Sequence, residues 1–132
     1  MGGAAIFLKK TIFSKVGGFD ENIFLYHEDD DLSLRLKNTV GPLMYCPQAN
    51  VIHEGGNSSL RNPKTAMLKG FHMGKSRVYT MKKYKINNYK VKCLLFAIIQ
   101  LMSIEMLFSK RKRAKYLAFF NGVKEELKED KV

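Results

Sequence analysis

The chain has 132 residues, 45% of them hydrophobic, and a formal net charge of +11 from 23 Lys and Arg against 12 Asp and Glu. This length suits one small domain or part of a larger one, and the composition excludes a disordered tail, a Pro-rich linker and a collagen-like repeat. The two cysteines, Cys46 and Cys93, form no C-x-x-C motif, so the sequence supports neither a zinc knuckle nor a disulfide framework. They suit a reducing compartment.

The N-terminal residues predict a short strand and then a short helix. The apolar run 4–8 lies between glycines and lysines, as a buried strand does. Thr11 is expected to cap a short helix that Gly17 and Gly18 end. Because the lysines follow the apolar run instead of preceding it, the segment is not a signal peptide, and we expect a cytoplasmic protein.

An acidic cluster and a helix come next. The four consecutive acids Glu28, Asp29, Asp30 and Asp31 suit a helix N-terminus, where free N–H groups and the macrodipole stabilise carboxylates. We therefore predict a helix over residues 30–38. The cluster has two interpretations: a capped helix start, or a site that holds a divalent cation or offers one carboxylate as a general base.

The middle of the chain predicts two short strands and a long helix. Residues 43–46 and 49–53 have the strand pattern, separated by Pro47. His53 ends the second strand, where a histidine is more often structural than a metal ligand, although the glycines after it would leave it accessible. Apolar residues at helical spacing then predict a helix from Pro63 to Tyr84.

The second half of the chain is basic. Residues 1–59 carry five basic and seven acidic side chains, whereas residues 60–132 carry eighteen and five. Residues 91–108 are almost all apolar and lie between lysines and the cations of 110–113, which favours contact with an anionic membrane surface at the inner face of the cell membrane. The alternative is a helical pair packed on the core, and a true span is disfavoured because polar residues interrupt the stretch. A further amphipathic helix is expected over 114–130.

Nucleic acid is not an expected partner. The tyrosines and phenylalanines of the basic half follow helical faces and form no stacking motif.

Several motifs together resemble a known family. GGFDENIFLYHEDDDLSLRL, preceded by GAAIFLKKTIFSKV and followed by YCPQANVIHEGGNSS, is similar to the acceptor-side half of family 2 glycosyltransferases, especially the bacterial rhamnosyltransferase-like members. The resemblance covers about residues 3–84. It implies an α/β fold, here a partial GT-A type transferase fold with a helical C-terminal extension. The implied domains are an acceptor-side half over 1–84 and a basic helical extension over 85–132, for which contact with the membrane is one expectation.

The resemblance also implies a reaction and its residues. Such enzymes pass a sugar from a nucleotide-diphosphate-sugar to a hydroxyl of a glycan or lipid-linked acceptor, with inversion and with Mg²⁺ or Mn²⁺, in cell-surface polysaccharide synthesis. Asp29 matches the catalytic base, with Asp30 as the alternative, and His53 matches a metal ligand of some members. Glu28, Asp30 and Asp31 would support the base at Asp29. Four positions match the sugar site: Gly3, Ala4, Phe19 and Asp20.

The donor-binding half is expected elsewhere. The sequence before GGAAIF contains no nucleotide-binding βαβ unit, so that half is expected on a separate chain or in a longer product, and this chain alone is expected to transfer no sugar. The alternative from another class is a non-catalytic membrane-peripheral or partner-binding module derived from a truncated transferase.

Overall fold

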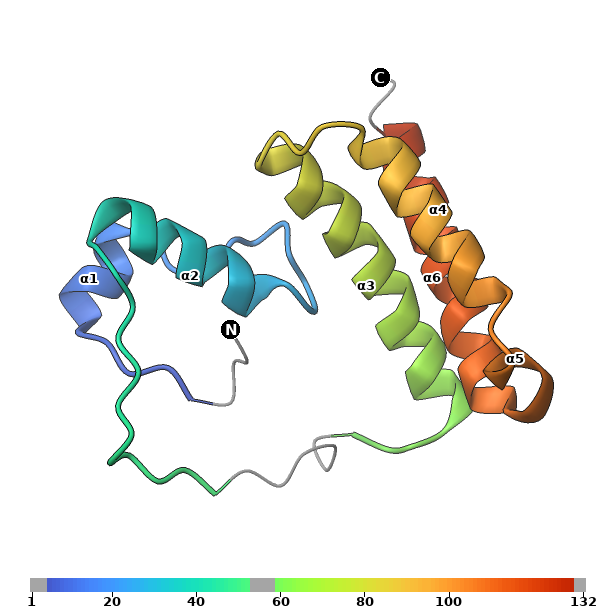
Figure 1. Ribbon diagram of the computed structural model, residues 1–132, viewed down its shortest axis with the longest axis horizontal. Helices are drawn as coiled ribbons and strands as arrows, with labels where there is room; N and C mark the ends of the chain where they lie inside the picture. Colours follow the sequence, from blue (N-terminus) through green and yellow to red (C-terminus); the bar gives the residue numbers. More distant parts are fainter. Residues whose placement is uncertain (1–4, 53–58, 130–132) are drawn as a thin grey trace.

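The computed structural model describes residues 5–52 and 59–129, and every regular element in these ranges is a helix (Figure 1). The six helices are α1 (Lys10–Lys15), α2 (Glu28–Thr39), α3 (Pro63–Lys83), α4 (Tyr89–Leu101), α5 (Glu105–Phe108) and α6 (Lys110–Glu129). The predicted α/β GT-A type fold is therefore wrong for this structure.

The segments predicted as strands pair with no other strand among the described residues. The described parts of 4–8, 43–46 and 49–53 form no β-ladder. A strand needs a neighbour to satisfy its backbone N–H and C=O groups, and the described residues supply none, so the apolar pattern alone does not produce a sheet. Phe7, Met44, Tyr45 and Ile52 are exposed as a result, each by more than 80%.

The N-terminal helices largely follow the sequence expectations. The predicted cap at Thr11 is wrong, because α1 begins at Lys10 with Lys9 as its N-cap, so Thr11 lies inside the helix. After the helix, Gly17 and Gly18 take positive φ angles of 83° and 69°, as expected of residues that end it. The predicted helix 30–38 is confirmed, and it is extended by two residues at its start, so that all four acids lie in its first turn. Leu32 and Leu36 form its buried face.

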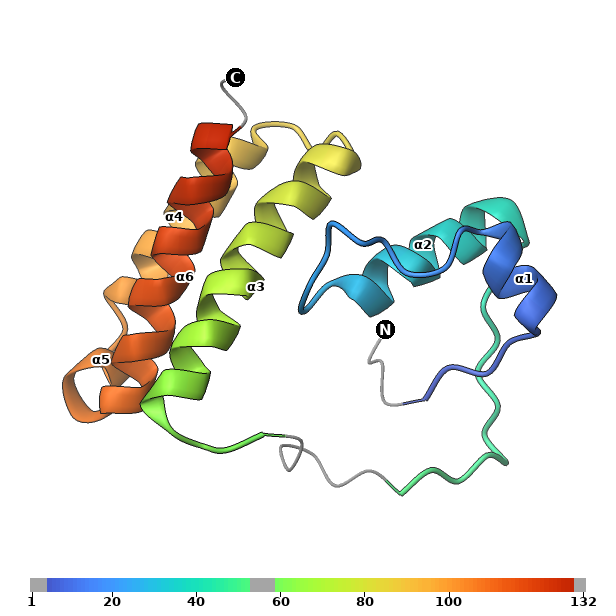
Figure 2. The same ribbon diagram turned by 180° about the vertical axis from the view of Figure 1, so that it is seen from behind.

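Helices α3, α4 and α6 form a bundle beside these N-terminal helices (Figures 1 and 2). The predicted helix from Pro63 is confirmed, and the side chain of its N-cap, Asn62, accepts a hydrogen bond of 2.8 Å from the backbone N–H of Thr65. The bundle core consists of Val78 from α3, Cys93 and Ala97 from α4, and Phe119 and Val123 from α6. Each of these five is at most 1% exposed.

Small residues allow α3 and α6 to pack backbone to backbone. A Cβ added to Gly70 would overlap the carbonyl oxygen of Lys115, and one added to Gly74 would overlap that of Phe119. Gly122 meets the α3 backbone in the same way. Since positions rise together along both helices, α3 and α6 run parallel, and their N-termini lie at the same end of the bundle (Figure 2).

The apolar stretch 91–108 is broken into two helices. Helix α4 ends at Leu101, and α5 starts at Glu105 after a turn. One face of α4 packs on α6, where the rings of Phe96 and Phe119 meet edge to face at 5.8 Å. Within the described residues, no helix has both the length and the apolar character to cross a membrane.

A large apolar surface remains exposed on the outer side of α4 and α5. Its most exposed members lie at or beyond the end of α4: Met102 80%, Ile104 71%, Leu107 71% and Phe108 83%.

The predicted domain boundary at residue 84 lies in the connection between α3 and α4, and α3 packs against α4 and α6 across it.

Candidate functional site

The acidic cluster begins at a backbone turn with an unusual conformation. Tyr26 and His27, directly before α2, have positive φ angles of 65° and 70°. Side chains larger than glycine rarely adopt this region, and such residues concentrate at functional sites when the surrounding structure holds them. Here Ser76 of α3 donates a hydrogen bond of 2.9 Å to the carbonyl of Leu25, and the ring of Phe24 lies 4.5 Å from that of His72. Helix α3 thus fixes the turn that presents the cluster.

The first three acids of the cluster are only partly buried. The Asp29 carboxylate accepts a hydrogen bond of 3.0 Å from the backbone N–H of Asp30. Asp30 also lies 3.6 Å from Nδ1 of His27. One carboxylate oxygen of Glu28 is buried and has no hydrogen-bond partner among the described residues. Asp29 is partly exposed and has no ion pair with another described residue.

Asp31, by contrast, is fully buried, and three described side chains donate hydrogen bonds to its carboxylate. Its carboxylate accepts hydrogen bonds of 2.8 Å from Arg35 Nε, 2.5 Å from Lys83 Nζ and 2.7 Å from the Tyr84 hydroxyl. Arg35 belongs to α2, whereas Lys83 is the last residue of α3 and Tyr84 follows it. Asp31 therefore connects α2 to the end of α3.

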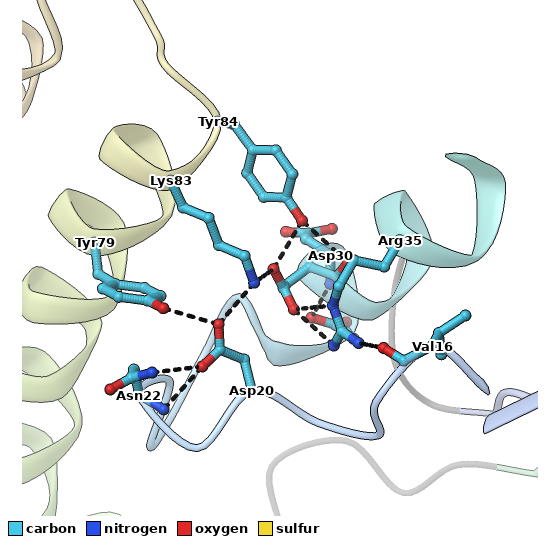
Figure 3. Close-up of polar contacts among 10 residues, drawn as sticks. Val16, Asp20, Asn22, Asp30, Arg35, Tyr79, Lys83 and Tyr84 are labelled. Atoms are coloured by element: carbon cyan, nitrogen blue, oxygen red, sulfur yellow. Dashed lines mark hydrogen bonds and ion pairs between the residues drawn. The ribbon is translucent and has the colours of Figure 1, made fainter. Parts of the chain in front are cut away.

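Asp20 joins the same network from the turn after α1 (Figure 3). One oxygen of its carboxylate accepts hydrogen bonds of 2.6 Å from Lys83 Nζ and 2.9 Å from the Tyr79 hydroxyl. The other oxygen accepts hydrogen bonds from the backbone N–H and the side-chain amide of Asn22. Lys83 is thus shared between two carboxylates. Asp20 and Asp31 are thus held by side chains of α3 and of the residue that follows it, whereas the described hydrogen bond of the Asp29 carboxylate comes from a backbone N–H.

The charges of this network shift its pKa values. Burial acts to raise the pKa of Asp31, but hydrogen bonds from Lys83, Tyr84 and Arg35 outweigh it and hold the pKa below its usual range. Burial also acts to raise the pKa of Asp20, but its hydrogen bonds, of which the one from Lys83 has the largest effect, hold that pKa well below its usual range. Burial and the hydrogen bond to Asp31 raise the pKa of Tyr84 to about 12. All of these groups therefore keep one protonation state near neutral pH.

The remaining predicted site residues are less informative. Gly3, Ala4 and His53 lie outside the described residues. Phe19 is 53% exposed and packs edge to face on Phe13, with ring centroids 5.5 Å apart. Among residues 5–52 and 59–129, no three histidine, cysteine or acidic side chains cluster closely enough to hold a metal ion.

Sequence reasoning missed the partners of the acids. Tyr79, Lys83 and Tyr84 lie some fifty residues or more from the acids they contact, and no spacing rule pairs them. Their positions near the C-terminal end of a long helix were the only available signal, since cations are favoured there. The turn at Tyr26 and His27 had no signal, because neither residue type favours a positive φ as glycine does.

Comparison with known proteins supplies a relative for part of the chain. Over 63 residues, or 48% of this chain, the sequence is 38% identical to N-acetylglucosaminyl-diphospho-decaprenol L-rhamnosyltransferase of Mycobacterium tuberculosis, in strains CDC 1551 / Oshkosh and H37Rv. The match covers 20% of that protein, so the chain spans only about a fifth of the length of these curated relatives. No family model and no solved structure matches the chain. The similarity supports a glycosyltransferase-like relationship for part of the chain.

Proposed function

We propose that the chain is the acceptor-side part of an inverting glycosyltransferase that adds a sugar to a lipid-linked acceptor. The observation that carries the proposal is the 38% identity to a mycobacterial rhamnosyltransferase whose name specifies a diphospho-decaprenol acceptor. The donor is a nucleotide-diphosphate-sugar, and the product belongs to cell-surface polysaccharide synthesis. The relatives' greater length supports a requirement for a donor-binding part as well.

Asp29 is the proposed general base. In an inverting displacement, the acceptor oxygen forms a bond to the anomeric carbon while the bond from that carbon to the nucleoside diphosphate breaks, and a carboxylate takes the proton of the acceptor hydroxyl. The structure supports Asp29 for this task because its carboxylate is partly exposed and has no described ion pair. Asp31 is unsuited to it, since it is fully buried and contacts two cations.

A metal ion enters the proposal only as a prediction. The described residues contain no metal-binding cluster, so they do not by themselves fit Mg²⁺ or Mn²⁺, and we assign no step to either ion. His53 remains the predicted ligand. Replacing it by alanine is expected to weaken metal or donor affinity, with partial recovery in excess Mn²⁺, whereas an unchanged metal dependence would remove His53 from this role.

Kinetics of single variants in the full product of the gene test the base. Asp29→Asn keeps the size of the side chain but cannot accept a proton, so kcat should fall by about 10² to 10⁴ while donor affinity stays nearly unchanged. Asp30→Asn is the matched control, because it removes one charge from the same helical turn. Full activity in Asp29→Asn would exclude Asp29, and a reversed pair of results would make Asp30 the base.

A second candidate function is a non-catalytic, membrane-peripheral module. The apolar side chains exposed at the end of α4 and on α5, followed by cations of 110–113, favour it, because such a surface suits the interface of an anionic bilayer. The same surface would also serve the enzyme, whose proposed acceptor is held in the membrane. Normal kcat in every carboxylate variant together with tight vesicle binding would favour the module.

A further inference from the structure

A basic cavity lies where the N-terminal ends of α3 and α6 meet. It has a volume of about 390 Å³, within the range of about 300–1,000 Å³ that is common for small-molecule sites. Its wall includes four cations: Arg61 just before α3, Lys69 in the second turn of α3, and Arg111 and Lys115 in the first two turns of α6. The described residues that line it include no acid.

The arrangement of the two helices adds to this positive charge. Because α3 and α6 run parallel, both present their N-terminal, electropositive ends here. The backbone N–H groups of a helix N-terminus are donors that anions commonly accept from. The cations and the helix ends therefore act together on whatever occupies the cavity.

The cations are close enough to disturb one another. Burial, followed by the neighbouring charges of Lys112 and Arg111, lowers the pKa of Lys115. Lys69 donates a hydrogen bond of 2.5 Å to the hydroxyl of Ser59, a neutral partner, and has no ion pair with another described residue. A bound anion would relieve this repulsion, and one with several charges would relieve it most.

Two neighbours of the cavity indicate the kind of anion. Tyr26, from the turn that presents the acidic cluster, forms part of its wall. Helix α5, with its exposed Leu107 and Phe108, lies at the same end of the bundle (Figures 1 and 2). One wall of the cavity thus comes from the turn that precedes the acidic cluster, and an apolar surface lies at the same end of the bundle.

We propose that this cavity binds a diphosphate ester, namely the diphosphate of a lipid-linked substrate. Its four cations match the charge of two bridged phosphates, and the exposed apolar residues of α5 suit the attached lipid. The assignment to a lipid rests on the proposed function, but the affinity for diphosphate does not. Bound here, the diphosphate would hold the acceptor beside Tyr26, in the turn that precedes the acidic cluster.

Calorimetric titration of the full chain with inorganic pyrophosphate tests the cavity. The variant Lys69→Met with Lys115→Met removes one cation of the cavity from each helix. The matched control, Lys64→Met with Lys128→Met, removes the same charge from the same two helices outside the cavity. We expect the first variant to weaken binding at least tenfold and the control less than twofold. Equal losses would show that only net charge matters and would overturn the proposal.

A second set of titrations identifies the source of the diphosphate. Geranyl diphosphate should bind more tightly than UDP, and geraniol, which lacks the phosphates, should not bind measurably. Tighter binding of UDP would contradict the assignment to a lipid. Arg111→Gln, a change at an exposed residue of the cavity wall, is an independent check: it should lower the affinity for pyrophosphate, but by less than the double variant Lys69→Met with Lys115→Met does. Because none of these titrations requires sugar transfer, a failure of the proposed function would remain distinguishable from a failure of the cavity.

Discussion

Replacing Asp31 by asparagine tests whether the buried carboxylate holds the acidic turn against the bundle. Asp31 is 0% exposed and contacts Arg35, Lys83 and Tyr84. Removing one member of a buried ion pair typically costs about 3–5 kcal/mol, because a buried charge then loses its partner. Arg35 and Lys83 are 21% and 27% exposed and keep other partners, so we take the lower end, about 3 kcal/mol.

Hydrogen exchange measured by mass spectrometry reports the stability of α2 separately from that of the bundle of α3, α4 and α6. A loss of about 3 kcal/mol corresponds to roughly a hundredfold faster exchange, at about 1.4 kcal/mol per factor of ten. We expect this acceleration in the amides of α2, with a much smaller change in α3 and α6, whose contacts do not depend on Asp31.

Lys85→Met is the matched control for the network. Lys85 is exposed, follows Lys83 by two residues and has no ion pair with a described residue. The Lys85→Met variant should leave hydrogen exchange in α2 unchanged, whereas Lys83→Met should accelerate that exchange. A change of less than threefold in the exchange of α2 in Asp31→Asn would refute this role of Asp31.

The other predictions concern the network, the bundle and the apolar surface. Because the pKa values of Asp20 and Asp31 are lowered in the folded state, their carboxylates stabilise the fold above about pH 4, and this stabilisation is lost as the pH falls through the folded pKa values. The raised pKa of Tyr84 stabilises the fold below about pH 10, and this stabilisation is lost as the pH rises through about 12. Urea unfolding should therefore show constant stability from about pH 5 to 9, and a maximum outside that window would contradict the assignment. Gly74→Ala should lower the free energy of unfolding by about 1–3 kcal/mol through overlap with α6, although alanine favours helices; a gain in stability would disprove the close packing. The chain should sediment with anionic but not neutral vesicles and be released as salt rises, and Phe108→Asp should weaken this; equal recovery with both lipids would count against membrane contact.

The sequence predicted the helices of this chain better than its strands. The long helix from Pro63 follows from a cap, a first-turn proline and apolar spacing, all of which are local signals. The predicted strands depended on pairing partners, and the described residues contain none. The close approach at Gly70 and Gly74 could have been anticipated from their spacing of four residues, which matches small residues at the same spacing in α6.

In the candidate site, too, local features could be predicted from the sequence, whereas features that depend on tertiary contacts could not. The position of Asp29 in the first turn of a helix follows from local capping rules, and the structure agrees. Which acids bind to the protein and which remain available depends on Lys83, Tyr79 and Tyr84. These residues reach the acids only through the tertiary arrangement of α2 and α3, so one sequence could not reveal it.

The anomeric configuration of the product tests the central claim most directly. The full product of the gene would be incubated with a panel of UDP- and dTDP-sugars that includes dTDP-L-rhamnose, and with N-acetylglucosaminyl diphosphate on a short polyprenyl chain as acceptor. The new glycosidic bond would then be assigned by NMR. We predict transfer with inversion, lost in Asp29→Asn and retained in Asp30→Asn. Transfer with retention of configuration, or equal transfer by both variants, would contradict the account.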